Sequence, residues 1–137
     1  MICAGARLRR CLLAFACSGF VLLPGCSDSD YDPVLEQWES RDELPGCGSL
    51  KLDQGESLTS EGKTEIACLR KALASGQGAE LRVRYPTVEG DLITEYFRVS
   101  SAGTTEVYTD ASDDENSDQA WHFASCAHPE TALDVNC

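Results

Sequence analysis

The sequence predicts a small, disulfide-stapled α+β domain in which one main helix packs on a three- to four-stranded antiparallel sheet. Three observations support this fold class. Apolar residues recur with helical spacing between residues 59 and 75. Three runs that alternate apolar and polar residues follow, with turn residues between them. An even number of cysteines also remains after a predicted export signal, which is typical of disulfide-bonded exported proteins.

Residues 1–25 indicate a lipoprotein signal peptide. Three arginines near the start precede an uncharged apolar run from Cys11 to Leu23, which is too short to span a bilayer comfortably. The tetrapeptide at 23–26, Leu-Pro-Gly-Cys, resembles a bacterial lipobox. That motif implies acylation of the Cys26 thiol, with chains such as palmitate, and cleavage just before it. The alternative is an ordinary cleaved signal with an incidental cysteine.

The residues after the lipobox predict the location of the protein. Ser27 resembles the pattern of lipoproteins sorted to the outer membrane in two-membrane bacteria. In other bacteria the protein would lie on the outer face of the cell membrane.

Residues 26–45 are expected to form a lipidated acidic tether and arm, with Val34–Trp38 as one helical turn or a packed arm. Residues 46–137 are expected to form the domain.

The charge of the chain excludes one class of partner. Acidic residues outnumber basic ones by 23 to 11, for a formal net charge of −12. Loss of the three leader arginines makes the net charge about −15. A chain this acidic is repelled by phosphate backbones and anionic headgroups, so we expect no nucleic-acid partner and membrane contact only through the lipid anchor.

The cysteines predict two disulfides. Of the 8 cysteines, three precede the lipobox and Cys26 is expected to carry lipid, which leaves four and three possible pairings. We favour Cys47–Cys68, because helical periodicity turns Cys68 away from the apolar stripe and the segment before the helix carries Cys47. Cys126–Cys137 then closes a short C-terminal loop.

The elements up to the main helix follow from local signals. Pro45-Gly46 predicts a turn, and the alternation around Leu50–Leu52 indicates an edge strand. The helix is expected over Thr59–Ser75. Thr59 or Ser60 is expected to cap its N-terminus. Ile66, Leu69 and Leu73 form its apolar stripe, and Gly76 or Gly78 is expected to end it.

An antiparallel meander is expected after the helix, with strands at Ala79–Tyr85, Leu92–Ser100 and Thr104–Thr109. Glu95 falls on the apolar face, a conflict that a sheet edge, a bulge or a functional role would explain. Trp121 and Phe123 are expected to pack on the core. Parity leaves the other face of the sheet to polar residues and tyrosines: Glu80, Arg82, Arg84, Thr94, Tyr96, Arg98, Glu106 and Tyr108.

Three short segments form a recognisable pattern: 79–83 (Ala-Glu-Leu-Arg-Val), 86–91 (Pro-Thr-Val-Glu-Gly-Asp) and 106–110 (Glu-Val-Tyr-Thr-Asp), with Trp121 and Cys126 downstream. With these segments the chain resembles an uncharacterised domain family of bacterial secreted proteins and lipoproteins over roughly residues 46–126. The resemblance implies a compartment and a fold but no activity. The chain departs from the family pattern in its longer acidic loop and its extra C-terminal cysteine.

The outward sheet face is the first candidate for function. Arg82, Arg84 and Arg98 alternate there with Tyr96 and Tyr108 on an otherwise acidic chain. Arginine beside tyrosine forms a stiff amphipathic patch suited to an envelope protein, peptide or glycan partner. The alternative is a solvated face with cross-strand ion pairs. The sequence therefore predicts a non-catalytic binding or accessory module.

The second candidate is a calcium-responsive envelope structural or stress factor. Calcium prefers several oxygen ligands, and residues 110–118 form an acidic loop. The spacing departs from an EF-hand, since Glu115 stands where glycine is needed and Trp121 where the bidentate acid belongs. A solvated loop is the alternative. The candidate ligands are Asp110, Asp113, Asp114, Glu115 and Asp118.

The third hypothesis is that the protein is a small secreted enzyme, but the sequence offers no residue to which catalysis can be assigned. No Gly-x-Ser-x-Gly or His-Glu-x-x-His motif occurs. Glu89 and Asp91 flank a glycine at a predicted hairpin tip, where no pocket is implied. His122 and His128 lie near Cys126, but a disulfide-bonded cysteine is no zinc ligand. We expect no cofactor and no metal.

Overall fold

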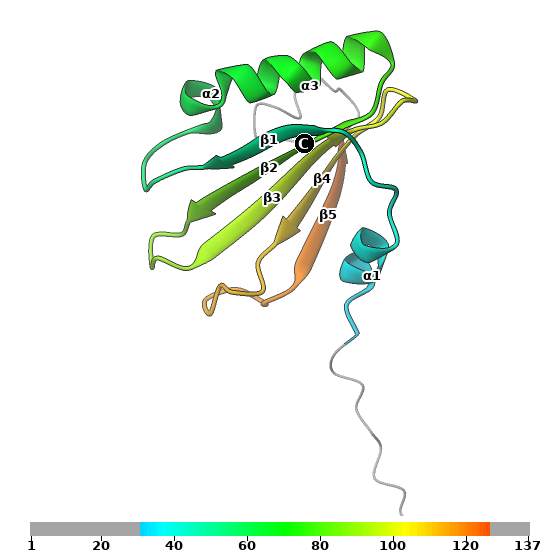
Figure 1. Cartoon of the computed structure of the whole chain (residues 1–137). Coiled ribbons are helices and arrows are strands. Elements are labelled where there is room, and N and C mark those ends of the chain that lie inside the picture. Colours follow the sequence, from blue (N-terminus) through cyan, green and yellow to red (C-terminus); the bar gives the residue numbers. More distant parts are fainter. Residues whose placement is uncertain (1–30, 127–137) are drawn as a thin grey trace, which may run out of the picture.

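The computed structural model describes residues 31–126, which form an α+β domain built on one five-stranded sheet (Figure 1). Helix α3 lies along one face of the sheet. The short helix α1 lies at the other side, near β5. The elements are α1 (Pro33–Glu39), β1 (Gly46–Lys51), α2 (Leu58–Glu61), α3 (Lys63–Ser75), β2 (Ala79–Pro86), β3 (Leu92–Val99), β4 (Thr105–Asp110) and β5 (Trp121–Cys126).

The sheet is larger than predicted and partly parallel. Its strand order is β1-β2-β3-β4-β5, with β1 parallel to β2 and the other pairs antiparallel. The prediction of three to four antiparallel strands was therefore wrong. The segment between β1 and β2 contains two helices, and such a crossover returns the chain parallel to the strand it left. The central meander was predicted at nearly its observed bounds.

The main helix is divided in two at Gly62, where one continuous helix was predicted. Ser57 caps α2 by accepting a hydrogen bond from the Ser60 backbone N–H, so the predicted caps Thr59 and Ser60 were wrong. A Cβ atom at Gly62 would lie 2.6 Å from Leu58 Cδ1 and 2.9 Å from the Leu58 oxygen. Only glycine fits this junction. Gly76 ends α3 with φ +65°, as its sequence position predicted.

The main core lies between α3 and the first three strands. Ile66 and Leu69 are buried, and Leu73 packs against the cluster from its edge, so the predicted stripe is confirmed. Burial of this apolar surface is the principal stabilising term for a domain of this size. The cluster comprises Leu52, Leu58, Ile66, Leu69, Ala72, Ala79, Leu81, Val83, Phe97 and Val99.

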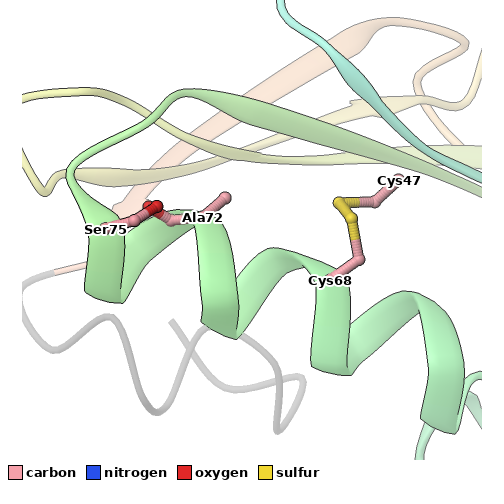
Figure 2. The surroundings of a disulfide bond; sticks show 4 residues. All are labelled: Cys47, Cys68, Ala72 and Ser75. Atoms are coloured by element: carbon pink, nitrogen blue, oxygen red, sulfur yellow. A yellow bond between two sulfur atoms is a disulfide. The ribbon is translucent and has the colours of Figure 1, made fainter.

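A disulfide joins Cys47 of β1 to Cys68 of α3, as predicted, with 5.6 Å between the two Cα atoms. Figure 2 shows Cys68 reaching from the helix toward Cys47. The bond ties the edge strand to the helix that covers it. Cys126 is buried at the end of β5. Its predicted partner Cys137 lies outside the described residues, so that pairing stays a prediction.

Replacing Cys47 and Cys68 together by alanine should lower the free energy of unfolding by about 3 kcal/mol, the loop-closure value for a separation of 21 residues. Cys68 is exposed and Cys47 is only partly buried, so lost packing should add little. Urea unfolding of the variant beside the unaltered protein measures the difference. An unchanged urea midpoint would contradict a stabilising role for the bond.

Candidate functional site

The sheet face opposite α3, here called the outer face, carries the predicted binding residues in continuous rows. Arg82, Tyr96, Tyr108 and Phe123 are successive register partners across β2 to β5. Trp121 pairs with Asp110 in the adjacent row and therefore lies on the same face. The expectation that Trp121 and Phe123 pack on the helix-covered core was wrong, because the register of β5 turns them to the outer face.

Trp38 of α1 packs on the outer face and forms a second apolar cluster there. Its ring centroid lies 4.0 Å from that of Tyr96, 5.2 Å from Tyr108 and 5.5 Å from Trp121. Trp38 is 9% exposed and Tyr108 only 2%. Burial raises the pKa of Tyr108, with the neighbouring Glu106 charge adding to the effect. Tyr108 is thus covered, not presented to a partner.

Asp32 fixes the start of α1 to β5, the edge strand of the sheet. Its Oδ1 accepts hydrogen bonds from the backbone N–H groups of Val34 at 2.8 Å and Leu35 at 3.1 Å, which caps the helix. Its Oδ2 accepts the Trp121 backbone N–H of β5 at 2.7 Å. The Trp121 hydrogen bond is the largest cause that lowers the pKa of Asp32. One carboxylate therefore orders the arm and joins it to the sheet edge.

Arg98 is used inside the domain and is unavailable to a partner. Its Nε lies 3.0 Å from a Glu80 oxygen and its Nη1 lies 3.4 Å from a Glu106 oxygen. Its Nη2 donates to the Asp42 backbone oxygen at 2.7 Å. The side chain is 8% exposed. The cross-strand pairing expected as the alternative to a binding patch therefore occurs at Arg98, and the prediction that Arg98 belongs to an exposed patch was wrong.

Arg41 packs on Trp38 and so helps to hold segment 32–42, here called the arm, against the aromatic cluster. Its guanidinium lies 3.0 Å from the centroid of the Trp38 ring, a cation–π contact. Its Nη1 donates to the Trp38 backbone oxygen at 2.8 Å, and its Nε lies 3.4 Å from Glu80. The sequence offered one signal for this arrangement, a large aromatic residue at position 38 inside a short acidic segment. Segment 32–42 is thus packed on the domain.

The half of the outer face toward β1 carries three basic residues, Lys51, Arg82 and Arg84, here called the basic strip. Lys51 is the register partner of Arg84, and Arg82 lies two residues away on the same face. Arg82 is exposed, with its guanidinium 5.8 Å from the Tyr96 ring centroid. Sequence reasoning missed Lys51, because its place beside Arg84 depends on the parallel pairing of β1.

The basic strip has no acidic partner within residues 31–126. The ion pairs of this part of the chain involve Arg41, Arg98 and His122, and none involves Lys51, Arg82 or Arg84. In addition, Arg84 Nε is a buried donor without a hydrogen-bond acceptor. The strip is thus a group of uncompensated positive charges on an acidic protein.

Asp110, Asp114 and Asp118 of the acidic loop make local side-chain contacts. Asp110 Oδ1 accepts from the Ser112 N–H at 3.1 Å and from its hydroxyl at 2.6 Å. Asp114 Oδ1 accepts from the Asn116 N–H, and Asp118 lies 3.0 Å from His122 Nε2. Asp113 and Glu115 are exposed. Across residues 31–126 no three potential metal ligands are grouped together, so the described loop does not assemble the calcium candidates.

The conformation of the turn between β2 and β3 follows from a glycine with positive φ and from a threonine side chain that caps the turn. Gly90 has φ +102°, a conformation that favours glycine. Thr87 Oγ1 accepts the Asp91 N–H at 3.2 Å. The Thr87 side chain thus caps the backbone of this turn. Glu89 is exposed at the tip.

Comparison of the chain with protein-family models, with curated proteins and with solved structures gives no match. The resemblance over residues 46–126 therefore stays a prediction. Within residues 31–126, no helix combines the length and the apolar character needed to cross a membrane.

Acid should weaken the docking of the arm. Because the pKa of Asp32 lies below its ordinary value of 3.8, its contribution to stability is complete above that pH and is lost as the pH falls through the lower folded-state pKa. The intrinsic fluorescence of Trp38 and Trp121, followed from about pH 6 to about pH 2, should report the release.

The Asp32→Asn variant should lack this acid-dependent component, because asparagine does not titrate. Asp42→Asn, at an exposed position of the same arm, is the matched control and should behave like the unaltered protein. An Asp32→Asn profile that overlays the unaltered one would show that the carboxylate does not hold the arm.

Proposed function

We propose that the protein is a lipid-anchored component of a bacterial cell envelope whose domain is a non-catalytic binding module for acidic protein segments. The leader and lipobox at residues 1–26 support the location. The observation that carries the binding role is the basic strip of Lys51, Arg82 and Arg84, which lacks an acidic partner in the described chain.

Electrostatics favours an anionic ligand for the basic strip. Like charges on neighbouring strands repel, and Lys51 is directly opposite Arg84. A carboxylate bound between them would relieve this repulsion. Guanidinium groups hold carboxylates through paired hydrogen bonds, which adds geometric selectivity to charge attraction.

The position of the basic strip favours an extended protein segment over a glycan. β1 is an edge strand with β2 as its sheet neighbour, so alternate backbone N–H and C=O groups of β1 face away from the sheet. An extended segment can pair with such an edge and direct its acidic side chains toward Lys51 and Arg84. Tyr96, beside Arg82, adds an aromatic surface. An acidic glycan would gain the charges but not the backbone pairing.

The chemistry of the basic strip favours binding over catalysis. Arginine guanidinium groups stay protonated in proteins and therefore act as fixed charges, not as proton carriers. The strip does not include a hydroxyl or thiol nucleophile paired with a base, which an enzyme of the acyl-transfer class requires.

The anchor predicts a specific mass. Protein extracted from its native membranes should have the mass of residues 26–137 plus acyl chains, because the lipobox implies cleavage before Cys26. Intact-protein mass spectrometry measures it, and a Cys26→Ala variant, which removes the acceptor thiol, is the control. An unacylated mass for the unaltered protein would contradict the anchor without bearing on the binding role.

Replacing Arg82 and Arg84 together by glutamine should weaken binding of an oligoglutamate peptide by about tenfold or more, roughly 1.4 kcal/mol, because both guanidinium contacts are lost. Fluorescence anisotropy at fixed, low salt measures the affinity. An oligoglutamine peptide of the same length should bind neither protein.

The matched control for this experiment replaces Arg70 and Lys71 by glutamine. Both are exposed on α3, on the opposite side of the sheet, and the change in net charge is the same. This control should bind oligoglutamate like the unaltered protein. Equal losses in the two variants would mean that net charge alone governs binding. Unchanged affinity after substitution of Arg82 and Arg84 would refute the role of the basic strip.

A further inference from the structure

A pocket of about 290 Å³ opens on the α3 side of the sheet, between the β1–α2 connection and the adjoining ends of β2 and β3. Leu52, Leu58, Val83 and Pro86 supply its apolar walls. Leu52, Leu58 and Val83 also belong to the main core, so these walls are fixed by packing. Its size is close to the lower end for small-molecule sites. The pocket shares no lining residue with the basic strip.

Glu95 places a carboxylate in this apolar pocket. It follows from the register, because Glu95 is the partner of Val83 and projects on the core side of β3. The Tyr85 hydroxyl donates a hydrogen bond to Glu95 Oε1 at 2.9 Å. Burial raises the pKa of Glu95, and the Tyr85 hydrogen bond opposes that rise. Burial also raises the pKa of Tyr85.

The carboxylate of Glu95 is incompletely compensated. No lysine, arginine or histidine forms an ion pair with Glu95 within residues 31–126. Its hydrogen bond in that part of the chain is made at Oε1, which leaves Oε2 available as an acceptor. Glu95 is partly buried, and a carboxylate that loses part of its hydration for one hydrogen bond is costly. Desolvated charges of this kind are concentrated at functional sites.

We propose that this pocket binds a small organic cation with an apolar body, of the alkylammonium or arylalkylammonium class. The ammonium group donates to Glu95, and the hydrocarbon part lies against Leu52, Leu58 and Val83. Charge complementarity selects this ligand class. The residues that line the pocket include three carboxylates, of Asp53, Glu56 and Glu95, and no basic side chain.

Other ligand classes fit the pocket less well. An anion is repelled by the same carboxylates. A neutral alcohol of the same shape gains the apolar contacts but leaves the charge on Glu95 uncompensated. Glu56 also accepts the Asp53 backbone N–H at 2.7 Å, which holds the β1–α2 connection in a turn that lines the pocket. The turn therefore adds a second carboxylate to the pocket lining.

The test compares phenethylammonium with its neutral analogue 2-phenylethanol on the full protein purified from its native membranes. Calorimetry at neutral pH gives both affinities. The amine should bind at least tenfold more tightly, because only the amine compensates Glu95. This comparison uses the unaltered chain and does not depend on a variant that folds. An alcohol that binds as tightly as the amine, or an amine that does not bind, would overturn the proposal.

Two substitutions then locate the effect. Glu95→Gln should weaken phenethylammonium binding at least tenfold and leave 2-phenylethanol binding unchanged. Glu89→Gln removes the same charge from the exposed tip of the β2–β3 turn, outside the pocket, and should leave both affinities unchanged. Equal losses in the two variants, or none in Glu95→Gln, would show that the amine responds to net charge or binds elsewhere.

Discussion

The packing of Trp38 on the outer face is the interaction on which the architecture depends. A sheet with one covered face would leave Tyr96 and Tyr108 in water, but the indole encloses them together with Trp121. Aromatic pairs of this kind each contribute about 0.5–1.5 kcal/mol beyond area burial. The gain matters because a small domain buries a limited core. The arm is consequently part of the folded unit, which extends back to Asp32, and is not merely a tether.

Covering the outer face also divides it. The β3–β5 half becomes a second core, closed by Arg41 and by the ion pairs of Arg98 with Glu80 and Glu106. The β1–β2 half remains accessible and retains the basic strip. Acidic residues are abundant in this chain, yet the two on this face that form ion pairs, Glu80 and Glu106, are engaged with Arg41 and Arg98. The proposed binding surface therefore results from where the arm ends, since the arm packs over the part of the face that holds Arg98 and leaves the basic strip uncovered.

The sequence predicted what local periodicity determines. The meander, the face assignment of Arg82 and Tyr96, and the Cys47–Cys68 bond follow from two-residue and helical repeats and were confirmed. The errors concern non-local pairing. The parallel direction of β1 depends on the crossover, and the inclusion of β5 depends on pairing with β4 across the acidic loop. Burial of Arg98 and Tyr108 depends on the distant Trp38, so no strand pattern alone could reveal it.

The two proposed sites lie back to back on the same strands. Arg84 is the neighbour of Tyr85 on β2, and its register partner Thr94 is the neighbour of Glu95 on β3. An uncompensated guanidinium on one face is thus close to an uncompensated carboxylate on the other. Because successive residues of a strand project on opposite faces, the Arg84 guanidinium serves the outer face and the Glu95 carboxylate serves the pocket. The same short stretch of two strands therefore supplies opposite charges to two separate surfaces, which explains why the two sites favour ligands of opposite charge.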